Sequence, residues 1–270
     1  MVCWSSDTAL PIGESLPLTL NDQQLDRYAR HIVLRDIGGA GQTSLLSSHV
    51  LLVGAGGIGC PAIQYLAAAG VGTISVVDDD VVSLSNLQRQ VLYGDAQIGE
   101  AKVDAAALAV SRLNPDVKFH AITQRIDHAT GTEILAGVDV VIDGSDNFGT
   151  RLIVNDLCLA AKVPLVSAAI GQFHGQIGTF TGWLPDAPCY RCFVGDAHDP
   201  DDCDDCATQG VLGAMCGLMG SFAAMEAIRV ITCFGEPQMG KLHVFDGMTP
   251  SMRSIRLPKD PACGSCGLPA

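Results

Sequence analysis

The sequence has little positive charge. Its 270 residues contain 16 lysines and arginines against 29 aspartates and glutamates, which gives a net charge of −13. So acidic a protein is a poor match for nucleic acid or an anionic membrane, and we expect neither as a partner. The first twenty residues contain no lysine or arginine, so they lack the charged start of a secretory signal. These absences favour a cytoplasmic protein.

Charged residues are also scarce, at 17% of the chain, whereas 48% of the residues are hydrophobic. Such a chain can bury a large core. The segment 50–77 has no charge, but it contains six glycines and Pro61, so a buried α/β core explains it better than a membrane span. We expect a flexible tail at 1–18 and a single domain at 19–268.

Apolar runs with strand and helix character alternate along the chain. We expect parallel strands at 50–53, 73–77, 117–122, 138–143 and 164–168, an antiparallel strand at 176–181, and a hairpin of 241–245 with 251–257. We expect helices at 21–33, 61–70, from 99 onward, 132–136, 147–162 and 211–233, with a turn at 38–41. The alternation predicts an α/β fold with a Rossmann-like, doubly wound, mostly parallel sheet and an antiparallel extension.

A glycine-rich loop follows the first strand, and an acidic residue follows the second. The loop glycines are Gly54, Gly56, Gly57 and Gly59. They let backbone N–H groups approach a phosphate at the start of a helix. Asp78, about 20 residues further on, is placed to accept hydrogen bonds from ribose hydroxyls. The pattern therefore predicts a nucleotide site, and taken alone it favours NAD or FAD.

Three charged side chains near this loop favour ATP instead. Arg89 and Lys102 can hold phosphates, and Asp146 is a possible Mg²⁺ ligand at a strand end. Lys102 falls in the first turn of its helix, where a positive charge opposes the helix dipole, which suggests a functional role. We expect Arg89 and Lys102 in a solvent-open cleft.

Two other functions remain open from the residues. An NAD-dependent oxidoreductase would bind nicotinamide without ATP turnover, but the sequence has no obvious constellation of His or Tyr residues for hydride transfer. A non-catalytic adenylate-binding scaffold for a protein partner would not need Arg89, Lys102 and Asp146.

The chain has 11 cysteines, an odd number, and no secretory signal, which favours metal ligands and free thiols over disulfides. Two Cys-x-x-Cys pairs predict a structural zinc site with four thiolate ligands, Cys189, Cys192, Cys263 and Cys266. A third pair, Cys203 and Cys206, competes with them. It is the poorer choice, because the two aspartates between its cysteines add negative charge to an already anionic centre.

Several of these motifs together resemble the MoeB/ThiF/HesA family, the bacterial relatives of ubiquitin-activating enzymes. The resemblance covers roughly residues 20–268 and is carried by Arg27-Tyr28-Ala29-Arg30, the glycine loop, Asp78-Asp79-Asp80-Val81, Leu84-Ser85-Asn86-Leu87-Gln88-Arg89-Gln90, Lys102, Asp143-Gly144-Ser145-Asp146-Asn147 and the two cysteine pairs.

The resemblance implies that the protein adenylates the C-terminal glycine of a ubiquitin-fold sulfur carrier ending in Gly-Gly. Arg89 and Lys102 would then hold the phosphates of ATP, and Asp146 would bind Mg²⁺. Asp78 would hold the ribose, with Asp80 and Asn86 also in the nucleotide site.

The resemblance also implies a homodimer, because the family's arginine at the position of Arg30 reaches into the neighbouring subunit's phosphate site. The chain ends just after the second cysteine pair, without a sulfurtransferase domain, so we expect a separate sulfur donor protein. Cys206 lies in a segment similar to that of the ThiF cysteine that forms a persulfide link. A cysteine also occurs there in MoeB-like relatives that do not need it, so sulfur transfer at Cys206 stays open.

Overall fold

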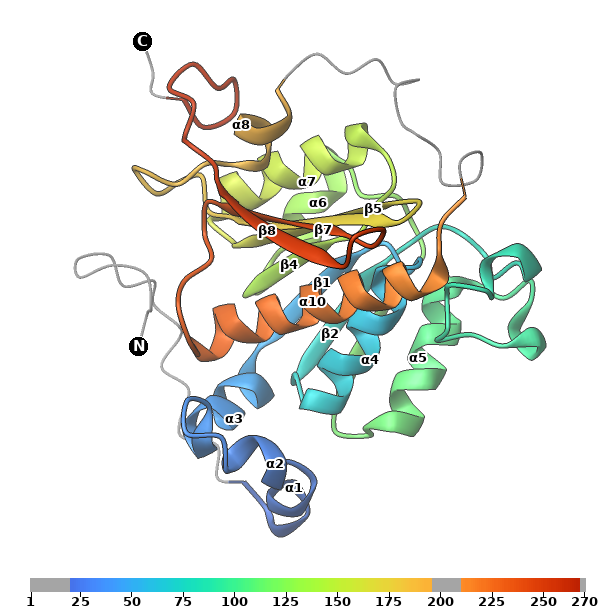
Figure 1. Ribbon diagram of the computed structural model, residues 1–270. Helices are drawn as coiled ribbons and strands as arrows, with labels where there is room; N and C mark the ends of the chain where they lie inside the picture. The colour runs from blue at the N-terminus through green and yellow to red at the C-terminus, as the bar shows by residue number, and fades with distance from the viewer. Residues whose placement is uncertain (1–19, 196–209, 268–270) are drawn as a thin grey trace.

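A computed structural model describes residues 20–195 and 210–267 of the chain. Its centre is an eight-stranded sheet in the order β3-β2-β1-β4-β5-β6-β7-β8 (Figure 1). The strands are β1 (His49–Val53), β2 (Thr73–Val77), β3 (Lys118–Ile122), β4 (Val140–Asp143), β5 (Leu165–Gly171), β6 (His174–Phe180), β7 (Lys241–Asp246) and β8 (Ser251–Arg256). Strands β1 to β5 pair in parallel, and β6 to β8 extend the sheet antiparallel. The expected fold class is confirmed.

Helices cover both faces of this sheet (Figure 1). In the described residues they are α1 (Asp22–Arg27), α2 (Ala29–Ile32), α3 (Gly38–Ser47), α4 (Gly59–Ala69), α5 (Lys102–Leu113), α6 (His128–Ile134), α7 (Phe148–Ala161), α8 (Tyr190–Val194) and α10 (Gly213–Thr232), with the 3-10 turns η1 (Leu84–Asn86) and η2 (Asp95–Gln97). The helices α3, α4, α5 and α10 pack on one face, and α6, α7 and α8 pack on the other.

The alternation of side chains along β1 shows how the two faces share the core. Val50 and Leu52 belong to the cluster under α4 and α10, whereas Leu51 and Val53 belong to the cluster under α7. Because β1, β2 and β4 are buried on both faces, they appear in the sequence as largely apolar runs, whereas the edge strand β3 is mostly exposed. The uncharged segment 50–77 is therefore a buried β1–α4–β2 unit.

The helix expected at 21–33 is largely present as α1 and α2, but it is divided at Tyr28, whose backbone leaves the helical conformation at φ −100° and ψ 12°. The expected turn at 38–41 is instead the first turn of α3. Gln42 and Leu45 of this helix are fully buried, so packing outweighs the low helix propensity of its glycines.

The helix expected at 132–136 begins earlier, as α6. Asp127 is its N-cap, because one carboxylate oxygen accepts hydrogen bonds from the backbone amides of Ala129 and Thr130. This cap starts the helix at His128, before its apolar residues appear in the sequence.

Among the described residues, α10 is the helix that is long and apolar enough to cross a membrane by length and composition. In the structure it packs against α4 and the sheet, with Met219, Ala223 and Ala227 buried in the core. The fold therefore uses α10 as a core helix. Its opposite side leaves Leu218 and Met225 exposed.

Tyr28 anchors α1 and α2 to the body of the protein. Its side chain is buried, and its hydroxyl accepts a hydrogen bond from Asn114 Nδ2 at 2.9 Å. Asn114 also donates to the carbonyl of Ala67 at 2.8 Å, so this contact ties the N-terminal helices to the end of α4.

We expect Tyr28→Phe to lower the free energy of unfolding by about 1 kcal/mol, because it removes one buried hydrogen bond and keeps the ring. Tyr65→Phe is the matched control, since Tyr65 is 58% exposed. Urea denaturation of the two variants measures the difference. Equal midpoints for Tyr28→Phe and wild type would contradict the anchoring role.

Candidate active site

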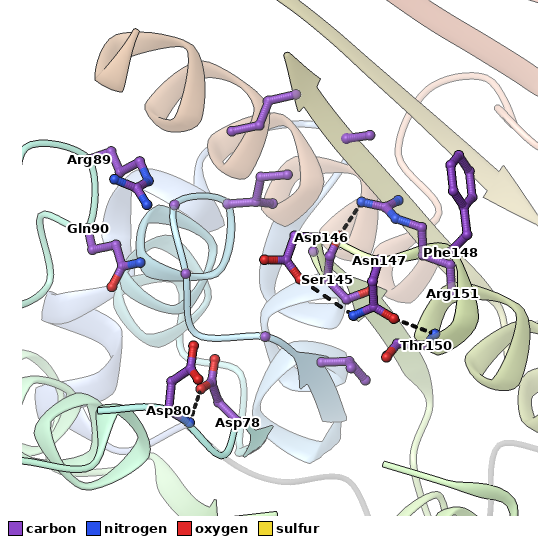
Figure 2. A pocket seen from close by; sticks show the side chains of 18 of the residues that line it. Asp78, Asp80, Arg89, Gln90, Ser145, Asp146, Asn147, Phe148, Thr150 and Arg151 are labelled. Atoms are coloured by element: carbon purple, nitrogen blue, oxygen red, sulfur yellow. Dashed lines mark hydrogen bonds between the residues drawn. The ribbon is translucent and has the colours of Figure 1, made fainter. Parts of the chain in front are cut away.

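A pocket of about 700 Å³ lies at the carboxyl ends of the parallel strands (Figure 2). Most of the nucleotide-site residues expected from the sequence line it, namely Gly54, Gly56, Gly57, Asp78, Asp80, Asn86, Arg89, Lys102 and Asp146. Gly59 and Arg30 are not among its lining residues. The strand order explains this convergence, because β2, β1 and β4 are neighbours and each ends at this edge of the sheet.

The glycine loop is closely packed. Gly54 has φ +96°, which favours glycine. A Cβ atom on Gly59 would lie 2.1 Å from the Gly54 carbonyl oxygen, so no side chain fits there. The missing side chain of Gly59 therefore lets the glycine loop pack against the start of α4. This role is structural and needs no contact between Gly59 and a ligand.

Asp78 shapes the loop from the neighbouring strand. One of its carboxylate oxygens accepts a hydrogen bond from the Ala55 amide at 2.7 Å, and the other accepts one from the Asp80 amide at 2.8 Å. The hydroxyl of Tyr93 donates to the Ala55 carbonyl at 2.9 Å, and burial raises the pKa of Tyr93. The backbone N–H and C=O groups of Ala55 are therefore both hydrogen-bonded to side chains, and these bonds fix the conformation of the glycine loop.

Lys102 is buried rather than solvent-open, so that expectation was wrong. Its side chain is only 5% exposed. The Nζ atom lies 2.6 Å from a carboxylate oxygen of Asp80 and 3.9 Å from one of Asp78. A buried cation needs such partners, because leaving water is costly for a charge. An anionic ligand that reaches Lys102 must compete with Asp80, which is itself largely exposed.

Arg89 is oriented by neutral groups. Its guanidinium donates to the Ser85 carbonyl at 3.1 Å and to Asn86 Oδ1 at 3.0 Å. Asn86, at the end of η1, therefore holds the arginine, in addition to lining the pocket. Because neither partner is charged, the positive charge of Arg89 remains available to an anion.

Asp146 enters the pocket from the loop between β4 and α7, on the side opposite Arg89 in Figure 2. Beneath this loop, the fully buried Asp143 accepts hydrogen bonds from the backbone amide and hydroxyl of Ser145. Arg151, on α7, donates to the Ser145 carbonyl and to the Ala168 carbonyl.

These contacts fix the backbone next to Asp146. Asn147 adds a further constraint, because its side chain caps α7 by accepting from the Thr150 amide at 2.8 Å. The loop can therefore present a carboxylate at a defined position, as a metal ligand requires.

Arg30 lies on α2 and is exposed. It does not line the pocket of its own chain, although the neighbouring Tyr28 fixes the helix that carries it. Within one chain, Arg30 is therefore separate from the other expected phosphate-binding residues.

The four cysteines expected to bind zinc come together, with their sulfur atoms all within 4.8 Å of one another. Their measured S···S distances are 3.8 Å for Cys189–Cys192, 3.6 Å for Cys189–Cys263 and 3.4 Å for Cys192–Cys266. A tetrahedral zinc ion with Zn–S bonds of about 2.3 Å places its sulfurs about 3.8 Å apart. The cluster therefore fits zinc. Cys203 and Cys206 lie outside the described residues.

Burial raises the pKa of the Cys266 thiol to about 11, and a bound cation would favour its thiolate form at neutral pH. Seven of the described cysteines form no disulfide, as expected from the sequence. Cys233 departs from that expectation because it is disulfide-bonded.

Helix α7 connects the cysteine cluster to the pocket. Asn155 accepts a hydrogen bond from the Tyr190 amide at 2.8 Å, next to Cys189. Asp156 accepts one from the Ser265 hydroxyl at 2.6 Å, between the other two cysteines. The same helix begins at the Asp146 loop and carries Arg151, so both sites are built on one rigid element.

Sequence reasoning missed the supporting residues of the pocket. Asp143 was quoted within a motif but given no role, and Arg151 was not noticed, because their contact depends on how α7 packs on β4 and β5. The one available signal was an acidic residue at the end of an apolar strand. Gln90 was quoted within a motif but given no role, although it lines the pocket and is 3% exposed. No local pattern indicated Tyr93.

Comparisons with known proteins agree with this geometry. The ThiF family model matches residues 28–265. The SAMP-activating enzyme E1 of Haloferax volcanii is 47% identical over 252 residues, which span 93% of this chain and 92% of that protein. The molybdopterin-synthase adenylyltransferase of Escherichia coli is 43% identical over 248 residues, or 92% of this chain and 98% of that protein.

Solved structures share the fold. The crystal structure of E. coli MccB with ATP superposes with a TM-score of 0.73 at 22% identity, over 84% of this chain and 69% of that chain. At this identity the likeness concerns the fold alone. The family match, by contrast, extends over nearly the whole described chain and is supported by relatives above 40% identity. The chain belongs to the ThiF family.

Proposed function

We propose that this protein uses ATP to adenylate the C-terminal glycine of a ubiquitin-fold sulfur carrier protein. The products are the carrier acyl-adenylate and pyrophosphate, and thiocarboxylate formation follows. Relatives above 40% identity are named as a SAMP-activating enzyme, a molybdopterin-synthase adenylyltransferase and a sulfur carrier protein adenylyltransferase, which supports this activity and the use of ATP.

The observation that carries the proposal is the charge arrangement around the glycine loop. Arg89, Lys102 and Asp146 come from three different segments and line one pocket. A triphosphate needs cationic groups and a metal ligand in addition to a glycine loop. This arrangement supplies all three around the same cavity.

The chemistry requires charge stabilisation more than proton transfer. A C-terminal carboxylate is ionised at pH 7, so it can attack the α-phosphate without a general base. As the bond to pyrophosphate breaks, negative charge grows on the leaving oxygens. Arg89 and Lys102 would stabilise that charge from fixed positions, and Lys102 would exchange Asp80 for phosphate. Asp78 would meet the ribose with the part of its carboxylate that faces the pocket.

Asp146 is the residue we propose to bind Mg²⁺, whose chemistry would be to neutralise phosphate charge. Asp146 lies on a loop that Asp143 and Arg151 hold in place through Ser145, and this fixed position supports the proposal. We further propose that Cys189, Cys192, Cys263 and Cys266 hold a structural zinc ion, because their sulfur spacing matches a tetrahedral site.

We propose that the protein acts as a homodimer in which Arg30 enters the neighbouring subunit's pocket. Arg30 is exposed and outside its own pocket, which supports a role across an interface. Large apolar side chains on α10 are also exposed, including Leu218 at 40% and Met225 at 41%. Such a surface is suited to covering by a second subunit.

A separate sulfur donor is also part of the proposal. None of the described residues that line the pocket is a cysteine, so the pocket itself offers no thiol for sulfur transfer. Cys206 lies outside the described residues, and its role in sulfur transfer stays a prediction, as does the cytoplasmic location. The tail 1–18 and the single domain 19–268 also stay predictions.

We expect Arg89→Ala and Lys102→Ala each to lower ATP–pyrophosphate exchange by about 10²–10³-fold, the effect of removing one fixed charge stabiliser. The assay uses a panel of ubiquitin-fold carriers ending in Gly-Gly. Arg112→Ala, at an exposed position on the far end of α5, is the control. Because Lys102 is buried, thermal unfolding must confirm that its variant is folded. Wild-type exchange in either folded variant would refute that residue's role, and no exchange by wild type with any carrier would refute the function.

We expect a mixture of Arg30→Ala and Lys102→Ala subunits to recover part of the activity that each variant lacks. In a mixed dimer, one pocket would contain both an intact Lys102 and an intact partner Arg30. Exchange is measured on heterodimers isolated with two different affinity tags. Isolated heterodimers without recovered activity would exclude action across the interface.

We expect one zinc ion per chain by elemental analysis, and Cys263→Ser to lower both the zinc content and the melting temperature. Cys158→Ser is the matched control, because Cys158 is buried but lies outside the cluster. Full zinc retention in a Cys189→Ser, Cys263→Ser double variant would assign the metal to Cys203 and Cys206 instead.

A further inference from the structure

Gln90 has a buried carboxamide with no hydrogen-bond partner among the described residues. Its side chain is 3% exposed, and its Oε1 atom is buried without a partner. Its backbone is fixed, because its amide donates to the Asn86 carbonyl and its carbonyl accepts from the Tyr93 amide. A buried polar group left unpaired is costly, so its partner is expected to be a ligand.

The position of Gln90 indicates which ligand. Figure 2 shows its side chain beside the glycine loop, between Arg89 and the pair Asp78 and Asp80. A Cβ atom on Gly56 would lie 3.8 Å from Gln90 Nε2, so the bare backbone of Gly56 leaves the amide facing the loop. Loop amides, the start of α4 and Arg89 all offer positive charge or N–H groups here, which suits a phosphate oxygen.

We propose that Gln90 is a nucleotide-binding residue whose carboxamide donates a hydrogen bond to a phosphate group of ATP over Gly56. This inference rests on the proposed function. The unpartnered Oε1 and the Nε2 that faces Gly56 exchange places by a half-turn about the last side-chain bond, so the NH₂ group can be offered on either side.

A neutral donor has a specific advantage at this position. Lys102, which is charged, is already paired with Asp80 in the free protein. A second lysine beside these aspartates would be captured in the same way. The amide of Gln90 forms no ion pair, so it stays available until the phosphate arrives.

The test compares Gln90→Met with wild type in two measurements. Met has nearly the same shape but no polar atoms. We expect the free variant to unfold at an unchanged or higher temperature, because no protein hydrogen bond is lost. We expect its dissociation constant for ATP, measured by calorimetry, to rise about 10- to 100-fold, the value of a hydrogen bond to a charged group.

Gln88→Met is the matched control, because Gln88 is exposed in the same segment and does not line the pocket. It should change neither measurement. Unchanged ATP affinity in Gln90→Met would refute the proposal. A lower melting temperature with unchanged affinity would assign Gln90 a purely structural role.

Two further comparisons distinguish phosphate from ribose. Gln90→Glu should bind ATP more weakly than Gln90→Met, because a carboxylate repels phosphate. The difference between wild type and Gln90→Met should persist with 2′-deoxy-ATP and 3′-deoxy-ATP. If it disappears with either, the contact is with the ribose and the phosphate assignment is wrong.

Calorimetry needs no carrier protein, so the two proposals can fail separately. A wild-type protein that binds ATP but exchanges with no carrier would contradict the proposed function while the Gln90 comparison still gives its result. A wild-type protein that does not bind ATP would refute both.

Discussion

The hydrogen bond from the Ala55 amide to the Asp78 carboxylate holds the candidate site in shape. At 2.7 Å it joins the glycine loop after β1 to the end of β2. Tyr93 fixes the other side of the same residue, and Asp80 and Lys102 are then placed by the turn that Asp78 shapes. A charge-assisted hydrogen bond of this kind is stronger than one between neutral groups. These bonds within the protein therefore fix the walls of the pocket.

The sequence predicted the sheet and the composition of the pocket well. Apolar runs identified β1, β2 and β4 because these strands are buried on both faces, and motif spacing identified Arg89, Lys102 and Asp146. Burial and partner choice could not be predicted. Lys102 is buried because the turn carrying Asp78 and Asp80 encloses it, and Arg151 reaches Ser145 only because α7 packs across β4 and β5. The N-terminal helices were also misjudged, since Tyr28 and Leu45 are placed by tertiary contacts that outweigh local propensity.

The two cations of the pocket are held in different ways, and this difference affects ligand binding. Arg89 is held by a carbonyl and an amide oxygen, which it can keep when an anion binds. Lys102 is held by the carboxylate of Asp80, whose side chain is 63% exposed and can turn to water. Binding at Arg89 therefore adds an interaction, whereas binding at Lys102 exchanges one. The net gain at Lys102 is smaller for the same number of contacts.

The bracing of α7 by the cysteine cluster has a consequence for how the chain acquires its native state during synthesis. The hydrogen bond between Ser265 and Asp156 spans 109 residues, and the Cys189–Cys263 contact spans 74. Strands β1 to β5 are made well before Ser265, so the sheet can form on the ribosome while one end of α7 still lacks its final partners. The contacts that fix the Asp146 loop lie within residues 143–168 and can form early, whereas the contact of α7 with the cysteine cluster forms only when the last residues are translated. A nascent chain can thus assemble the walls of the pocket before the cluster that braces α7 from its other side is complete.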